Sequence, residues 1–93
     1  MNWWSEAALL WLPEDGQAYP ADFAVRAAPG TSDFYYLAID AFEAVIRERS
    51  LKSDLQPWVY ILDEGKLLSP SEVAECMVDW RLEFNRARSS AQN

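Results

Sequence analysis

The chain has 93 residues, of which 51% are hydrophobic and 14% aromatic, so it can bury one packed core but has no room for a second. It carries 15 acidic residues against 8 basic ones, and the formal net charge of -7 repels nucleic-acid phosphates and anionic lipid headgroups. Histidine is absent and cysteine occurs once, which excludes His-based catalysis, histidine or four-cysteine zinc sites, and a CxxC redox pair. We predict no catalytic residue, metal or cofactor.

The composition and the N-terminal residues predict a cytoplasmic domain. Glu6 falls where the apolar run of a secretory signal would lie, and no stretch approaches the roughly 20 apolar residues of a membrane helix. The single Cys76 fits a reducing compartment, because it cannot form an internal disulfide. We expect one compact domain over residues 1–86, a polar tail over residues 87–93, and no contact with a membrane.

The first segment, "NWWSEAALLWLPEDG", allows either a helix or a strand. As a strand, neither alternating set is purely apolar, because Ser5 interrupts one set and Glu6 the other. As a helix, Ser5 can cap the first turn, Pro13 marks the end, and alanine, leucine and glutamate favour the conformation. The helix is the preferred interpretation, and it gathers five residues on one face: Trp4, Ala7, Ala8, Trp11 and Leu12.

Two adjacent tryptophans begin this segment, and they cannot point the same way. Neighbouring residues lie about 100° apart on a helix and on opposite faces of a strand. The helical spacing of Trp4, Ala8 and Trp11 assigns Trp4 to the core and leaves Trp3 exposed. Because exposed tryptophan is enriched among residues that anchor protein interfaces, Trp3 is a candidate partner-binding residue.

The next stretch, "AYPADFAVRAA", alternates apolar and polar residues. Alternation of this kind is typical of a half-buried strand. Pro20 indicates that the strand either starts here or lies at the edge of the sheet, because proline lacks the amide hydrogen that a central strand needs.

A buried helix is predicted after the break at Pro29-Gly30. The run "DFYYLAIDAFEAVIRER" repeats apolar residues at helical spacing on two adjoining lines, and Ser32 can cap it. Tyr36 lies off both lines, so it is a second candidate for contact with a partner. The negative pole of the helix dipole accounts for a basic cluster near the end of this run: Arg47, Arg49 and Lys52.

A β-hairpin is predicted before the last helix. Trp58 to Leu62 is rich in strand-forming residues, a turn falls at Asp63-Glu64-Gly65, and Lys66 to Leu68 forms a short return strand.

The last helix has the clearest start signal in the chain. Ser69 and Glu72 have the spacing of a capping box, and Pro70 occupies the first helical position between them. We expect the helix to run from Pro70 to about Arg86. Its apolar face contains Val73, Cys76, Met77, Trp80, Phe84 and Ala87.

Four carboxylates lie at helical spacing on this last helix. Acids near a helix N-terminus suit its dipole and the others suit a solvated face, so a structural role is the simplest interpretation. A recognition stripe for a basic partner is an alternative, and paired acids in catalysis are a weaker one. The four residues are Glu72, Glu75, Asp79 and Glu83.

Cys76 falls on the apolar face of the same helix. Its acidic neighbours raise the pKa of a thiol, whereas a reactive cysteine needs an electropositive, exposed setting. We therefore expect a buried structural thiol.

These elements give the order α-β-α-β-β-α and predict the α+β class, with a small, mostly antiparallel sheet of about three strands covered by two or three helices. The lack of catalytic groups favours a non-enzymatic interaction domain that binds a basic surface of another protein, such as a surface that itself binds nucleic acid. Small acidic inhibitors, antagonists and immunity-type proteins have this size and charge. The candidate partner-binding residues are Trp3, Tyr36, Glu72, Glu75, Asp79 and Glu83.

Two alternatives for the function stay open. The chain could be an obligate subunit or form a homodimer through its aromatic surplus. It could also be a small enzyme or ligand-binding domain that uses carboxylates, although no convergent polar constellation is visible in the sequence.

Overall fold

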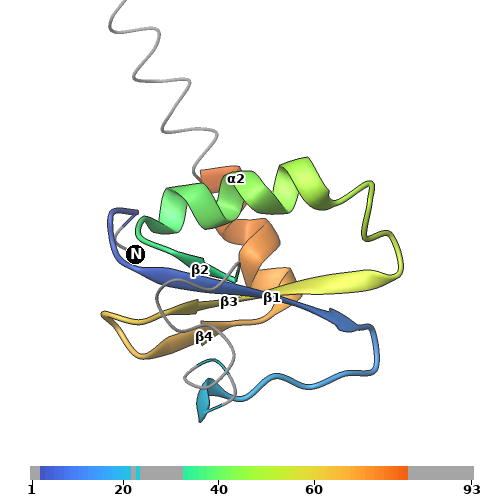
Figure 1. Cartoon of the computed structure of the whole chain (residues 1–93), viewed down its shortest axis with the longest axis horizontal. Helices are drawn as coiled ribbons and strands as arrows, with labels where there is room; N and C mark the ends of the chain where they lie inside the picture. The colour runs from blue at the N-terminus through green and yellow to red at the C-terminus, as the bar shows by residue number, and fades with distance from the viewer. Residues whose placement is uncertain (1–2, 22, 24–32, 80–93) are drawn as a thin grey trace, which may run out of the picture.

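One antiparallel sheet, with strand order β2-β1-β3-β4, is the framework of the domain (Figure 1). The computed structural model describes residues 3–21, 23 and 33–79. The predicted α+β class with an antiparallel sheet is confirmed, and the described residues give the sheet four strands. The elements are β1 (Ala7–Pro13), β2 (Phe34–Tyr35), α2 (Ala38–Glu48), β3 (Leu55–Ile61) and β4 (Lys66–Leu68), with a further helix at residues 70–79.

The prediction of a helix in the first segment is wrong, because residues of this segment form the strand β1. This strand pairs with β3 along its whole length and with β2 at its start. The strand begins at Ala7, so Ser5 and Glu6 precede it and do not interrupt it. Apolar layers cover β1 on both faces, and its first four residues are therefore all buried. A strand buried on both faces reads as a continuous apolar run instead of an alternating one.

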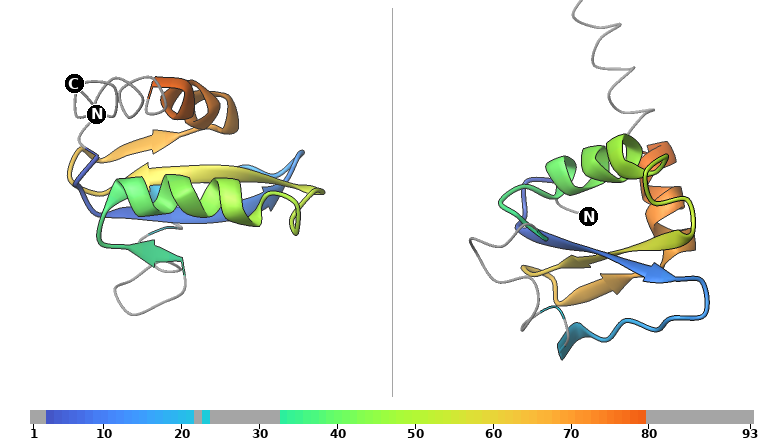
Figure 2. Two further views of the ribbon diagram at one scale, coloured as in Figure 1. Left: turned by 90° about the horizontal axis from the view of Figure 1, so that it is seen from above. Right: turned by 45° about the vertical axis from the view of Figure 1, so that its right-hand side comes forward.

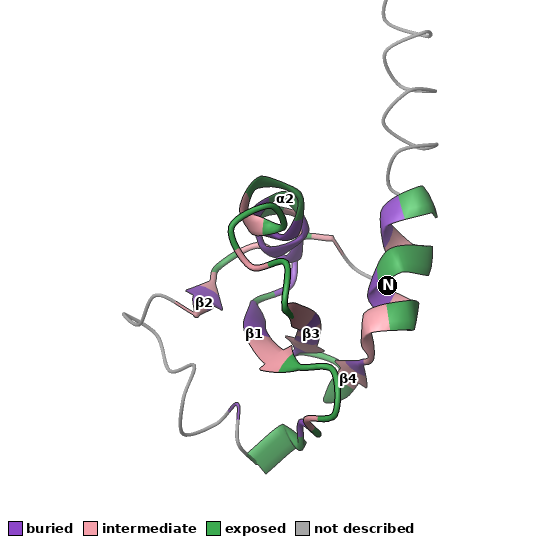
Figure 3. Cartoon of the chain, turned by 90° about the vertical axis from the view of Figure 1, so that its right-hand side faces the viewer, coloured by how far each residue is buried: buried purple, intermediate pink, exposed green. Residues whose placement is uncertain are grey.

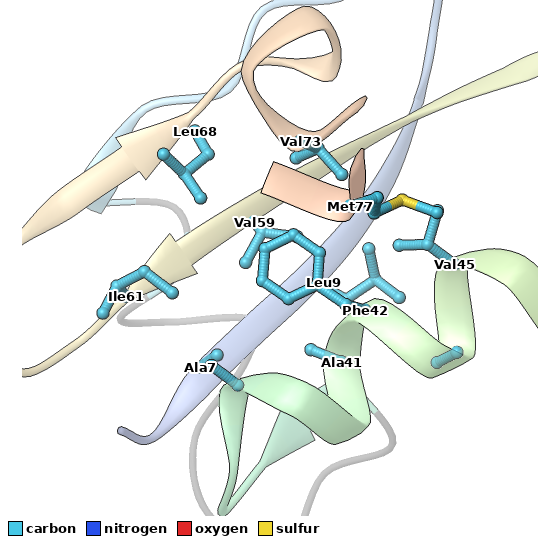
Figure 4. Packing of buried hydrophobic residues seen from close by; sticks show 12 residues of the cluster. Ala7, Leu9, Ala41, Phe42, Val45, Val59, Ile61, Leu68, Val73 and Met77 are labelled. Atoms are coloured by element: carbon cyan, nitrogen blue, oxygen red, sulfur yellow. The ribbon is translucent and has the colours of Figure 1, made fainter. Parts of the chain in front are cut away.

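One face of the sheet is covered by α2 and by the 70–79 helix (Figures 2 and 3). Phe42 and Val45 from α2 meet Val73 and Met77 from the 70–79 helix above the strands (Figure 4). Both helices thus bury their apolar stripes in the same cluster, which is the first core of the domain. The cluster contains Ala7, Leu9, Ala38, Ala41, Phe42, Ala44, Val45, Val59, Ile61, Leu68, Val73 and Met77.

The opposite face of the sheet packs against the segment that follows β1. Ala18 and Phe23 of this segment form a second cluster with Ala8 and Leu10. The strand predicted over "AYPADFAVRAA" is wrong where the structure describes it, since residues 20, 21 and 23 are helical. The predicted alternation put Tyr19 and Phe23 on the same side of the strand, and it also fails, because Phe23 is buried while Tyr19 is exposed. Residues 22 and 24–28 of that stretch lie outside the described residues.

The helix α2 begins at Ala38, four residues after the first apolar residue of the predicted helix, because Phe34 and Tyr35 pair with β1 as β2. Its N-cap is Leu37, which makes no side-chain capping bond, and the predicted cap Ser32 lies outside the described residues. The predicted apolar lines account for most of the buried side of α2, but Ile46, which they include, is exposed, and Ala44, which they leave out, is buried. Its buried residues are Ala38, Ala41, Phe42, Ala44 and Val45.

The predicted hairpin and helix start are both confirmed. β3 and β4 are joined through a turn in which Gly65 has a φ of 61°, a left-handed conformation that favours glycine. The Ser69 amide donates to Glu72 Oε1 at 3.2 Å, and the Glu72 amide donates to Ser69 Oγ at 3.4 Å, which completes the capping box. The predicted helix end near Arg86 lies outside the described residues, as do Trp80, Phe84 and Ala87.

Candidate functional site

The two N-terminal tryptophans have the opposite environments to those predicted. Trp3 is half-buried and packs against the first core, where its ring meets Phe42 edge-on at a centroid distance of 5.2 Å. Trp4 has 68% of its surface exposed. The assignment of Trp4 to the core and of Trp3 to the surface is therefore wrong.

The backbone around β1 explains this exchange. Trp3 and Trp4 precede the strand and belong to no helix, so helical spacing does not set their directions. The Trp3 carbonyl oxygen accepts a hydrogen bond from the Ile39 amide at 3.0 Å. This bond fixes Trp3 at the first turn of α2, and its ring reaches the first core from there.

A pocket opens at the edge of the sheet where β1 begins and β3 ends, and we call it the edge pocket. The β1/β2 and β1/β3 registers, continued one residue beyond Ala7, set Glu6 between Tyr36 and Leu62. Three chain segments that are distant in sequence are therefore brought together by strand pairing alone. The lining residues are Trp4, Ser5, Glu6, Tyr36, Leu62 and Asp63.

Two hydrogen bonds hold the acidic side of the edge pocket in place. The Leu62 amide donates to the Glu6 carbonyl oxygen at 3.0 Å, which joins the segment before β1 to the segment after β3. Ser5 is only 6% exposed, and its hydroxyl donates to Asp63 Oδ2 at 3.4 Å. The Ser5 bond orients the Asp63 carboxylate, while Asp63 and Glu6 remain at the surface.

The aromatic side of the edge pocket is formed by Trp4 and Tyr36. Tyr36 has 69% of its surface exposed, as predicted, although it lies in the bend between β2 and α2 and not on the helix. Its ring meets the buried ring of Phe34 edge-on, with a centroid distance of 5.0 Å and an interplanar angle of 87°. Phe34 therefore supports an aromatic ring that solvent can still reach.

The chemistry of the edge pocket suits a cation. Aromatic faces attract ammonium and guanidinium groups, and carboxylates accept charge-assisted hydrogen bonds from them. In the edge pocket these two kinds of group come from adjacent positions on the same sheet edge. Of the residues predicted to bind a partner, Tyr36 lines the pocket, whereas the sequence interpretation missed Trp4, Glu6, Leu62 and Asp63.

The four acidic residues at helical spacing on the last helix do not share one environment. Glu72 belongs to the capping box, and the hydrogen bond from the Ser69 amide is the main reason that the pKa of the Glu72 carboxyl is lowered. Glu75 and Asp79 are exposed on the 70–79 helix, in the surroundings of a solvated face. Glu83 lies outside the described residues.

Cys76 is half-buried against the first core. Burial is the main cause that raises the pKa of its thiol, Lys66 opposes this effect, and Asp79 adds to it. The pKa of the Cys76 thiol is thus raised, as predicted, although burial raises it more than the acidic neighbours do. A thiol with a raised pKa is a poor nucleophile at neutral pH.

A second hollow lies between α2 and the 70–79 helix. Val45, Val73 and Met77 form its apolar floor, and Arg49 of the α2 C-cap lies at its rim. Val78, which also lines it, has 58% of its surface exposed. The lining is mostly apolar, and its polar members are Arg49 and Gln56.

The part of the chain that the structure describes contains no group of three or more Cys, Asp or Glu side chains placed to hold a metal ion. Nor does it contain a helix with the length and apolar character needed to cross a bilayer. Comparison of the chain with known protein families, curated proteins and solved structures gave no match.

Proposed function

We propose that this protein is a non-enzymatic interaction domain of the cytoplasm that binds, and thereby blocks, a basic surface of a partner protein. The observation that carries the proposal is the edge pocket. There the exposed rings of Trp4 and Tyr36 share one pocket with the carboxylates of Glu6 and Asp63, on a chain with a net charge of -7.

The negative charge of the domain and the aromatic rings of the edge pocket contribute to binding in different ways. The negative field of the whole domain attracts a basic surface over a distance, which raises the association rate and repels acidic proteins. Aromatic rings supply affinity once they are buried, because tryptophan and tyrosine are enriched among the residues that dominate interface energetics. This domain is acidic and exposes aromatic rings at one edge of its sheet, so it combines a fast association with a basic surface and a source of affinity for it.

The carboxylates argue for recognition instead of catalysis. An acid that donates a proton near neutral pH needs a raised pKa, which burial or a neighbouring like charge provides. The Ser69 amide donates to Glu72 and lowers the pKa of this carboxyl, which is the opposite of what such an acid needs. Glu72 is therefore unsuited to that role, and this favours the interaction domain over an enzyme that uses Glu72 as its acid.

An obligate subunit or homodimer is the second candidate, and the groove between α2 and the 70–79 helix favours it. Val78 exposes 58% of its surface beside this groove, and a second copy could cover it. Two copies that each carry a net charge of -7 repel one another, however, whereas a basic partner is attracted. Light scattering on the purified chain separates the two cases, since a homodimer has twice the mass of 10.7 kDa.

The proposal is tested by isolating the partner and rebuilding the complex. Affinity capture with the full chain, followed by mass spectrometry, identifies candidates, and each is then purified and mixed with the protein. We expect a basic protein that forms a complex of fixed stoichiometry with the monomer. Its affinity falls steeply as salt rises, because salt screens exposed charges, and its own activity falls on binding. A partner that is neutral or acidic, or a complex insensitive to salt, overturns the proposal.

A further inference from the structure

Resting on the proposed function, we infer that the edge pocket receives one arginine side chain of the partner. The guanidinium group packs against the aromatic side formed by Trp4 and Tyr36, and it donates hydrogen bonds to the carboxylates of Glu6 and Asp63. The juxtaposition of these four residues at one sheet edge carries the inference.

The order of residues along the pocket suits a planar cation. The strand register sets Glu6 between Tyr36 and Leu62, so a carboxylate has an aromatic neighbour on one side and an aliphatic one on the other. Residues that lie directly opposite one another on paired strands point to the same face, so the Glu6 and Tyr36 side chains are neighbours on one face of the sheet. Asp63 follows Leu62 directly, and its carboxylate is oriented by Ser5.

Arginine fits this arrangement better than lysine. The guanidinium group is flat, stacks on aromatic faces, and presents several N–H donors in a fixed fork that matches carboxylate oxygens. The lysine ammonium is compact and strongly hydrated, so it loses more hydration on entering the pocket and gains less from the rings. The pocket lies open at the surface, and Trp4 and Tyr36 are 68% and 69% exposed, so a side chain projecting from a protein can reach it.

The pocket is preorganised for such a ligand. The Leu62–Glu6 hydrogen bond, the Ser5–Asp63 hydrogen bond and the contact of Phe34 with Tyr36 all form without a partner. Binding therefore orders few side chains, which lowers its entropic cost.

The test uses three short peptides that differ at one position. Each has lysines at both ends and either arginine, lysine or the uncharged isostere citrulline at the centre. Binding to the full chain is followed by NMR at low salt, through the backbone amides of Tyr36 and Leu62 and the indole N–H of Trp4, which a Trp4→Phe variant assigns. We expect the arginine peptide to shift these signals and to bind about two- to fivefold more tightly than the lysine peptide. The citrulline peptide should bind most weakly.

Matched variants show whether the pocket itself is responsible. Tyr36→Ala should reduce the affinity of the arginine peptide to that of the lysine peptide. Tyr19→Ala should not, although Tyr19 is also exposed, because Tyr19 does not line the pocket. The melting temperature of each variant confirms that it folds.

A second pair of variants tests the carboxylates. The double variant Glu6→Gln/Asp63→Asn should weaken binding of the arginine peptide by at least about threefold. The double variant Glu14→Gln/Asp15→Asn removes the same charge from exposed positions just after the opposite end of β1, and it should change the affinity little.

Equal affinity for the arginine and lysine peptides, or no effect of Tyr36→Ala, overturns the inference. So do unchanged pocket signals at millimolar peptide. If the charged peptides instead shift the amides of Glu75 and Asp79, the inference fails while the proposed function stands. The proposed function fails separately, when the rebuilt complex with a captured partner shows no dependence on salt.

Discussion

Trp3 and Trp4 show how the same residue type serves two purposes at neighbouring positions. Trp3 packs edge-on against Phe42 and contributes to the first core, whereas Trp4 stands at the surface in the edge pocket. Sequence spacing could not separate them, because their directions depend on the backbone before β1. The Ile39 amide, which donates to the Trp3 carbonyl oxygen, fixes that backbone.

This difference predicts opposite effects of two alanine substitutions. Trp3→Ala should lower the free energy of unfolding by about 2–4 kcal/mol, because it removes a large ring that packs on the core. Trp4→Ala should lower the free energy of unfolding by less than Trp3→Ala does, as expected at a more exposed site, yet weaken partner binding. Urea titration of both variants measures the stabilities. Similar losses of stability for both variants would contradict the assignment of Trp4 to the surface.

At the scale of the elements, those with local signals were predictable from the sequence. The capping box of the last helix and the Gly65 turn of the hairpin depend on residues only a few positions apart. β1 was not predictable in this way, because its burial on both faces removes the alternation that identifies a strand. β2 contains two residues and is defined only by its pairing with β1.

The hairpin turn depends on the left-handed conformation of Gly65. Gly65→Ala should lower the free energy of unfolding by about 1–2 kcal/mol, since a Cβ strains this conformation although space is available for it. Gly65→Asn should cost less, because asparagine adopts this conformation more readily. Thermal or urea unfolding of the two variants checks the order. An alanine variant as stable as the original protein would show that the turn does not need glycine.

The capping box of the 70–79 helix predicts a dependence of stability on pH. The pKa of Glu72 is lowered from 4.5 by the hydrogen bonds with Ser69, so the folded state binds this proton less readily than the unfolded state does. The stabilisation is therefore complete above pH 4.5 and is lost as the pH falls through the lowered pKa of the folded state.

Substitution of the cap provides the measurement. Ser69→Ala should lower the free energy of unfolding at pH 7 by about 1 kcal/mol and move the pKa of Glu72 back toward 4.5. A carbon-detected NMR titration of the Glu72 carboxyl follows the pKa directly. A Glu72 pKa that is the same in both proteins would mean that the Ser69 hydrogen bonds are not its cause.

At the scale of the whole molecule, the candidate site exists only because the sheet assembles it. Residues 4–6, 36 and 62–63 share no sequence motif, and the β1/β2 and β1/β3 registers bring them together. The sequence therefore pointed to Tyr36, which stands off the apolar lines of its segment, but not to Glu6 or Asp63. The net charge of -7 follows directly from the composition, and it supports the proposed binding to a basic partner.

The most direct test of the central claim compares two double charge reversals in the rebuilt complex with the basic partner. Glu6→Lys/Asp63→Lys changes the edge pocket, and Glu75→Lys/Asp79→Lys changes the 70–79 helix by the same charge. We predict that the edge-pocket variant raises the dissociation constant at least about tenfold more than the helix variant, because a lysine in the pocket opposes the bound cation. Equal losses, or a larger loss for the helix variant, would contradict the edge pocket as the binding site.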